Sequence, residues 1–117
     1  MTAAVTIAPP PGQIWFLERP RLGNAAHGHS VLITQVRPSE GTVTINFIAT
    51  ASTSHNDLLL RHDLDGFESL GLKHDSYLLV EHAYDLGTDR FLAHGTYKGR
   101  LTGEVKKLVE DWWGESL

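Results

Sequence analysis

Cysteine is absent from the 117 residues of this chain. A disulfide framework and a thiolate metal site are therefore both excluded, and the composition suits a reducing compartment. Long apolar runs are missing as well, so we expect neither a signal sequence nor a membrane span. These absences together predict a cytoplasmic protein that does not enter a membrane.

Basic residues are in the minority. Ten Lys and Arg residues stand against 14 Asp and Glu residues, which gives a formal net charge of −4 with His neutral. No positive field spread over the whole protein can then attract nucleic acid, so a nucleic-acid site would have to be a local basic patch. The length allows one domain with a real core. We expect residues 1–11 to form a flexible arm and residues 12–117 to form that domain.

The chain does contain short apolar segments that are typical of β-strands. "SVLITQV" (30–36) and "TVTINFIAT" (42–50) are joined by "RPSEG", whose Pro and Gly predict a hairpin turn. In the second of these segments, alternation predicts that Val43, Ile45 and Phe47 point inward, with Thr44 and Asn46 outward. The other predicted strands are "QIWFLE" (13–18), part of 57–62, "SYLLVEHAYDL" (76–86) and "FLAHGTYKGRL" (91–101).

In the final segment, the spacing of the apolar residues is that of an α-helix and no longer that of a strand. Val105, Leu108, Val109 and Trp112 recur at the spacing of one helical face, and Thr102 is a suitable N-cap residue. The sequence therefore predicts a mostly β protein, a small antiparallel barrel of five or six strands with a C-terminal helix.

The run "ERPRLGNAAHGHSVLIT" (18–34) places two arginines and two histidines before a predicted buried strand. Imidazole can act as an acid or a base near neutral pH, and a guanidinium can carry phosphate charge. His27 and His29, with Arg19 or Arg21, could therefore meet a phosphate. Solvent-exposed decoration of a long loop is the other interpretation, and the residues alone leave both open.

Other polar clusters also allow a functional and a structural interpretation. A zinc site made of His27 and His29 with His55 or His82 matches no common zinc spacing, so we expect no metal and no cofactor. The hydroxyl-rich run 49–55 is either a polar loop or part of a site.

Two charged or aromatic stretches are expected to be structural. "RHDLD" (61–65) is interpreted as a charged surface turn. "DWW" (111–113) is interpreted as core or dimer edge more readily than as a platform for base stacking.

Taken in order, the segments resemble those of the MazF/PemK/Kid toxin family. The resemblance spans residues 12 to 113 and rests on "GQIWFLE", "HSVLIT", "TVTINFIATAST", "GLKHDSYLLVEHAYDL" and "KGRLTGEVKKLVEDW". It implies an SH3-like barrel with a C-terminal helix, a homodimer and an antitoxin partner. It also implies an endoribonuclease that cuts single-stranded RNA without metal, by attack of the ribose 2′-OH on the adjacent phosphate.

The sequence departs from the family at one position of the implied site. The family places its catalytic arginine just before the second strand, where this chain has Gly28 and His29. We therefore predict that His27 and His29 perform the acid–base steps and that Arg21 supplies the cation. Thr50 matches the family's hydroxyl at the end of the third strand, and is predicted to be catalytic too. The predicted substrate-binding residues are Arg19, Ser52, Thr53, His55, Glu81 and His82.

Two alternatives to this endoribonuclease remain. A barrel of the same ancestry could bind a protein or a nucleic acid and cut nothing, which the net charge favours. The fold also hosts gyrase-poisoning toxins. The groove rich in His, Ser and Thr favours the endoribonuclease, which is the preferred hypothesis.

Overall fold

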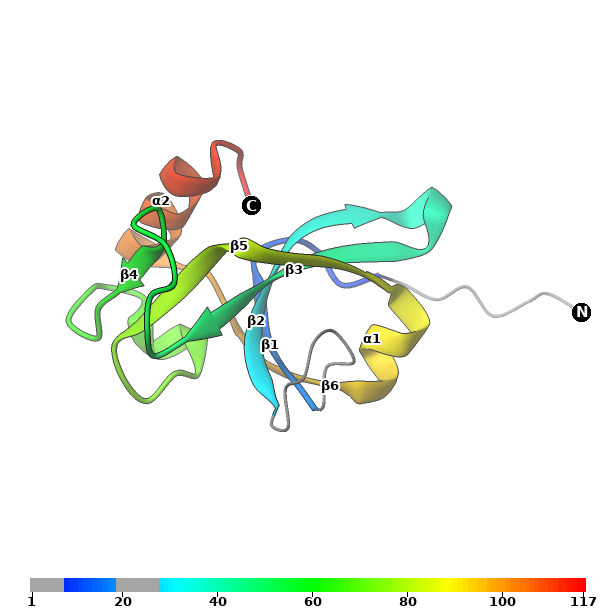
Figure 1. Ribbon diagram of the computed structural model, residues 1–117, viewed down its shortest axis with the longest axis horizontal. Helices are drawn as coiled ribbons and strands as arrows, with labels where there is room; N and C mark the ends of the chain where they lie inside the picture. The colour runs from blue at the N-terminus through cyan, green and yellow to red at the C-terminus, as the bar shows by residue number, and fades with distance from the viewer. Residues whose placement is uncertain (1–7, 19–27) are drawn as a thin grey trace, which may run out of the picture.

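The computed structural model describes residues 8–18 and 28–117. Six antiparallel strands form one sheet in the order β4-β5-β3-β2-β1-β6, which curls into a half-barrel flanked by two short helices (Figure 1). This confirms the expected mostly β class. The strands are β1 (Gln13–Leu17), β2 (His29–Arg37), β3 (Thr42–Ala49), β4 (Leu58–Leu60), β5 (Ser76–Gly87) and β6 (Gly95–Arg100). The helices are α1 (Thr88–His94) and α2 (Gly103–Trp113), with 3₁₀ turns η1 (Pro38–Glu40) and η2 (Phe67–Leu70).

The predicted hairpin is confirmed as β2 and β3. Its turn is η1, which begins with Pro38 and ends at Gly41 in the left-handed conformation, with φ 66°. Proline supplies the φ of the turn, and glycine takes a positive φ without steric cost. Local residue chemistry therefore determines this element.

The sheet carries an apolar core on each face. The α2-side core contains Leu32, Ile48, Val105 and Val109, and the α1-side core contains residues such as Ile33. Neighbouring residues of β2 serve opposite cores because side chains alternate across a strand. Both faces of the central strands are therefore covered.

Coverage of both faces corrects one prediction about β3. Thr44 and Asn46, expected to point outward, are buried. The Thr34 hydroxyl donates to Asn46 Oδ1 at 2.9 Å, and Asn46 Nδ2 donates to the Leu79 carbonyl at 3.0 Å. The Thr44 hydroxyl instead bonds to Asp85 and Arg37 at the edge of the core. Alternation in the sequence does not predict the burial of these two residues, because each polar side chain has hydrogen-bond partners in the fold.

Strand β5 is interrupted by a bulge. Asn46 of β3 pairs with Ala83, whereas Ile48 pairs with Leu78, so residues 79–82 of β5 fall outside the regular register. The side chain of Asn46 bonds to the backbone of this bulge at Leu79. Beyond it, Leu78 also pairs with Leu58 of β4.

The predicted strand 91–101 is partly wrong. Residues 88–94 form helix α1, and only Gly95–Arg100 form a strand. The helical turn buries Phe91 completely in the α1-side core, where its ring centroid lies 5.0 Å from that of Trp15. Tertiary packing of one aromatic ring thus outweighs local strand propensity.

Helix α2 is where the sequence places it, but its buried face is narrower than predicted. Val105 and Val109 are fully buried, whereas Leu108 is 36% exposed. Trp112 is half-buried and its Nε1 donates to the Asn56 carbonyl at 2.8 Å. Thr102 holds the N-cap position without a capping hydrogen bond from its side chain. In the described part of the chain, no helix has the length and apolar character to cross a membrane.

Candidate functional site

Of the two arginines and two histidines in the run 18–34, the structure describes His29; Arg19, Arg21 and His27 lie outside the described residues. His29 begins β2 and pairs with Leu17 of β1. Its half-buried ring stacks on Phe47, with the ring centroids 5.1 Å apart and the planes at 14°. His29 therefore packs beside the α1-side core, to which Phe47 belongs.

Gly28 has a steric reason to be glycine. A Cβ at this position would overlap the ring of Phe16 and lie 3.0 Å from the Leu17 carbonyl oxygen. No larger side chain fits there while Phe16 keeps its place. The position at which the resembled family carries arginine is thus filled here by an aromatic ring.

Thr50 lies in a groove of about 340 Å³ at the end of β3. Three strands meet there, because Ser30 of β2 pairs with both Phe16 of β1 and Ile48 of β3. We call it the Thr50 groove. Its lining residues are Phe16, Ser30, Ile48, Ala49, Thr50, Gly71, Leu72, Lys73, His74, Ser76 and Lys98.

The structure does not bring His29 and Thr50 together in this groove. Ser30, not His29, is the β2 residue that lines it. The two neighbours point to opposite faces of the sheet because side chains alternate along a strand. The groove is thus built without the imidazole that the sequence favoured.

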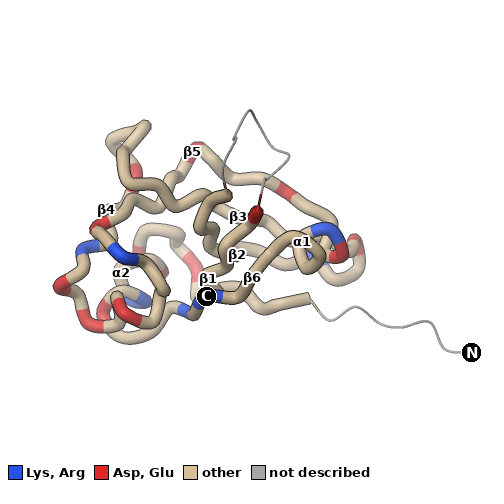
Figure 2. Tube along the Cα trace, turned by 90° about the horizontal axis from the view of Figure 1, so that it is seen from below, with Lys and Arg blue, Asp and Glu red and all other residues tan. Residues whose placement is uncertain are grey.

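The Thr50 groove is basic although the chain carries a net negative charge. Lys73, His74 and Lys98 line it, and none of its described lining residues is acidic. Lys98 Nζ lies 5.9 Å from the centroid of the Phe16 ring, a distance at which cations interact favourably with an aromatic face. Asp75 lies between the lining residues His74 and Ser76 but does not itself line the groove. Figure 2 shows acidic positions at several places along the described trace. The lining of the groove is therefore locally basic.

Hydroxyl groups add hydrogen-bonding capacity to the groove. The Ser76 hydroxyl donates to the His74 carbonyl at 2.9 Å, so its proton is used within the loop. Within the described residues, the hydroxyls of Thr50 and Ser30 have no hydrogen-bond partner. Thr50 is exposed and Ser30 is half-buried. These two groups are therefore available to a bound molecule.

Ser52 and Thr53, predicted to bind substrate, hold the loop after β3 in shape. Asp57 Oδ2 accepts hydrogen bonds from the Ser52 hydroxyl at 2.9 Å and from the amides of Thr53 and Ser54 at 2.8 and 2.9 Å. Asp57 Oδ1 accepts a further bond from the Val80 amide at 2.9 Å. Desolvation raises the pKa of Asp57, but these bonds outweigh it and lower that pKa to about 2.

The remaining predicted substrate-binding residues lie elsewhere. His55 is exposed in the same loop, and Glu81 and His82 belong to the β5 bulge. None of the three lines the Thr50 groove. Of the predicted site residues that the structure describes, only Thr50 is in it.

His62 and Asp75 form a hydrogen-bonded pair next to the segment that carries Lys73 and His74. Asp75 Oδ1 accepts bonds from the His62 backbone amide at 2.7 Å and from His62 Nδ1 at 2.5 Å. The side-chain bond is the main reason that the pKa of His62 is raised, and the backbone bond is the main reason that the pKa of Asp75 is lowered. The pair ties the start of this loop to its end.

No spacing in the sequence predicts that Lys73, His74 and Lys98 lie near Thr50. Lys73 and His74 are adjacent in the loop after η2, whereas Lys98 lies in β6. Gly71 is the one residue that hints at this arrangement, because a Cβ at its position would lie 3.0 Å from the Lys98 Cβ. A close approach of the loop to β6 therefore requires glycine at that position.

Neither the family models nor the curated proteins include a match to this chain. Across residues 8–18 and 28–117, no cluster of three or more His, Asp and Glu side chains is placed to hold a metal ion. The fold and the groove define a mostly β domain with a basic groove at one end of its sheet. A functional assignment therefore depends on the chemistry of the groove.

Proposed function

We propose that this protein is a metal-independent endoribonuclease with an SH3-like barrel of the MazF/PemK/Kid kind, and that single-stranded RNA lies in the Thr50 groove. The main support for this proposal is the set of residues that line the groove. The hydroxyl that matches the family's third strand lies in a groove with two lysines and an imidazole, and no described lining residue is acidic. The resemblance also motivates an antitoxin partner and a homodimer as parts of the proposal.

The lysines suit the phosphate backbone. The ammonium groups of Lys73 and Lys98 offset the charge of a phosphodiester, and that charge grows in the pentavalent transition state. The hydroxyls of Thr50 and Ser30 donate to its oxygens. RNA binding thus becomes compatible with a net charge of −4, because the attraction is local.

His74 supplies the acid–base chemistry of the proposed reaction. Its neutral ring accepts the proton of the ribose 2′-OH while that oxygen attacks the adjacent phosphorus. The bond from phosphorus to the 5′ oxygen breaks, and the ring returns the proton to the leaving oxygen. The products are a 2′,3′-cyclic phosphate and a free 5′-OH. His74 takes the role that the sequence assigned to His27 and His29.

The alternative is an RNA-binding module without cleavage. It is favoured by the stacking of His29 on Phe47, which leaves His74 as the one imidazole among the described lining residues. A reaction that divides the acid and base roles between two histidines has only His74 among the described residues that line the groove. The two functions predict the same RNA contacts and differ in the products.

Cleavage of a labelled single-stranded RNA in the presence of EDTA tests the proposal. The wild-type protein is expected to produce cyclic phosphate ends, and His74→Ala is expected to lower the rate about 10²–10⁴-fold, the usual contribution of one acid–base group. His94→Ala, at an exposed position of α1, is the matched control and should cut at the wild-type rate. Binding without products at any pH would establish the alternative. Equal rates for His74→Ala and wild type would contradict the role of His74.

A further inference from the structure

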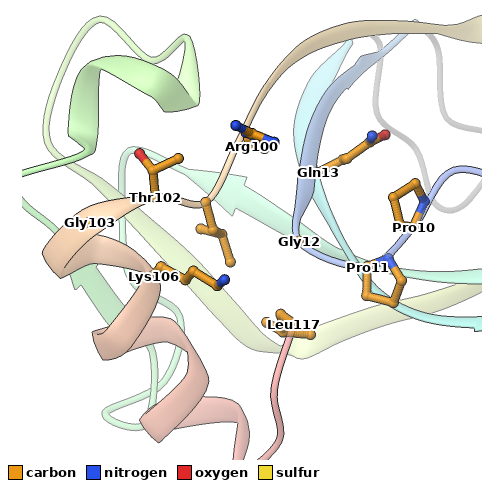
Figure 3. A pocket seen from close by; sticks show the side chains of 10 residues that line it. Pro10, Pro11, Gly12, Gln13, Arg100, Thr102, Gly103, Lys106 and Leu117 are labelled. Carbon is orange, nitrogen blue, oxygen red and sulfur yellow. The ribbon is translucent and has the colours of Figure 1, made fainter.

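A second groove, of about 500 Å³, lies between the start of β1 and helix α2 (Figure 3). Arg100 at the end of β6 and Lys106 of α2 contribute its positive charge, and we call it the Arg100 groove. In Figure 3, the Lys106 side chain reaches from α2 toward the β1 side. Pro10, Pro11 and Leu117 provide apolar surface. The groove thus offers cations beside an apolar lining.

The two cations of this groove form no ion pairs within the described residues. None of the described lining residues is acidic, and neither Arg100 nor Lys106 forms an ion pair with a described carboxylate. Glu110, one helical turn beyond Lys106, accepts a hydrogen bond from the Leu117 amide at 2.7 Å instead. Arg37 and Arg61, in contrast, each pair with a carboxylate. Arg100 and Lys106 are therefore not held in ion pairs by the described part of the chain.

The backbone around the groove is fixed in place. Gly12 has φ 92°, its amide donates to the Ile33 carbonyl at 2.8 Å, and its carbonyl accepts from the Leu101 amide at 2.8 Å. A Cβ on Gly12 would lie 3.2 Å from the Leu117 backbone carbon, so glycine allows that segment to close one side. A site of this kind needs little rearrangement to bind a ligand.

Strand β6 connects the two grooves. Lys98 lines the Thr50 groove and Arg100, two residues further along the strand, lines the other. Ser69 of η2 donates from its hydroxyl to the Arg100 carbonyl at 2.9 Å, which fixes the end of the strand. One edge of the sheet therefore presents cations to both grooves.

We propose that the Arg100 groove binds a phosphate of the same RNA strand that occupies the Thr50 groove. The inference rests on the proposed function and adds a second contact site for that substrate. Its ligand is a phosphodiester, recognised by the guanidinium of Arg100 and the ammonium of Lys106. A strand long enough to reach both grooves gains the second contact, and a trinucleotide confined to the Thr50 groove does not.

Binding of fluorescent single-stranded RNA, measured by anisotropy over a series of salt concentrations, tests this inference. The probes are a trinucleotide and a strand of about twelve nucleotides, which is within the usual site size of such grooves. Arg100→Gln with Lys106→Gln should weaken binding of the longer strand severalfold. The slope of log K against log salt should fall by about 0.7 for each lost phosphate contact. Binding of the trinucleotide should be unchanged.

Two matched double variants make the outcomes distinguishable. Arg90→Gln with Lys107→Gln removes the same charge from exposed positions outside both grooves and should leave the salt slope near the wild-type value. Lys73→Gln with Lys98→Gln should weaken both probes. If only this last variant affects the longer strand, the second site is refuted and the proposed function stands. If the Arg100 and Lys106 variant weakens the trinucleotide equally, the two grooves are not separate sites. If wild type binds neither probe, both proposals fail.

Discussion

Asp57 accepts a hydrogen bond from the Val80 amide at 2.9 Å and thereby joins the loop after β3 to the bulge in β5. The same carboxylate bonds to Ser52, Thr53 and Ser54. These bonds add to the pairing of β3 and β4 with β5, which flanks both irregular segments. Among the described residues, the carboxylate of Asp57 therefore makes the largest single set of hydrogen bonds to this loop, beside the bond from Trp112 to the Asn56 carbonyl.

Replacing Asp57 by Ala should destabilise the protein by about 1–3 kcal/mol, because several polar groups lose their partner. Urea unfolding with Asn56→Ala as the neighbouring control measures the difference. The pKa of Asp57 is lowered to about 2 in the folded state. Asp57 therefore contributes its whole stabilisation above the pKa of an unfolded Asp, about 3.9. That stabilisation is lost as the pH falls through the lower pKa of the folded protein. Equal acid sensitivity of wild type and variant below pH of about 4 would contradict this.

The His62–Asp75 pair gives a prediction about titration. The pKa of His62 is raised, chiefly by its side-chain bond to Asp75, so Asp75→Asn should lower it toward the ordinary histidine value. NMR titration of the ring measures the shift, with Asp63→Asn as the control for a weaker, more distant charge. An unchanged His62 titration in Asp75→Asn would refute the pairing.

The same pair sets a pH window. Because the pKa of His62 is higher in the folded than in the unfolded protein, its charged form stabilises the fold. This stabilisation is complete below the pKa of the unfolded protein, and it is lost as the pH rises through the pKa of the folded protein. The pKa of Asp75 is lowered, so its contribution is present above the unfolded value and is lost as pH falls. The pair therefore holds the loop best between about pH 4 and 6.5. Hydrogen exchange of the His62 amide should be slowest, relative to Asp75→Asn, in this window.

Gly28→Ala should destabilise the fold by about 1–3 kcal/mol, the usual cost of overpacking, because its Cβ meets the Phe16 ring. Phe16→Ala should remove most of that extra cost, so the double variant should show clear coupling in unfolding measurements. Gly87→Ala is the control, since a Cβ there meets no atom within 4 Å. Additive effects of Gly28→Ala and Phe16→Ala would show that the two residues do not compete for space.

Val109→Ala should cost about 2 kcal/mol, through lost burial and the cavity left in the α2-side core. Leu108→Ala, one position earlier and 36% exposed, should cost clearly less although it removes more atoms. Thermal and urea unfolding of the two variants measures the contrast. A larger loss for Leu108→Ala would reverse the assigned faces of α2.

The elements that sequence could predict are those decided by neighbours along the chain. The β2–β3 turn follows from Pro38 and Gly41, whose backbone preferences act within a few residues. Helix α2 follows from the spacing of Val105 and Val109, which are one turn apart. Such signals are local, so they survive without knowledge of the rest of the fold.

Tertiary structure decided the rest. Phe91 turns the start of a predicted strand into a helix because the α1-side core has room for its ring. Lys73 and Lys98 come to lie beside Thr50 because the loop after η2 folds against β6. Their positions in the sequence reveal none of this. Contacts between distant segments depend on how strands order themselves in the sheet, and that order minimises exposed apolar surface over the whole chain rather than within any one segment.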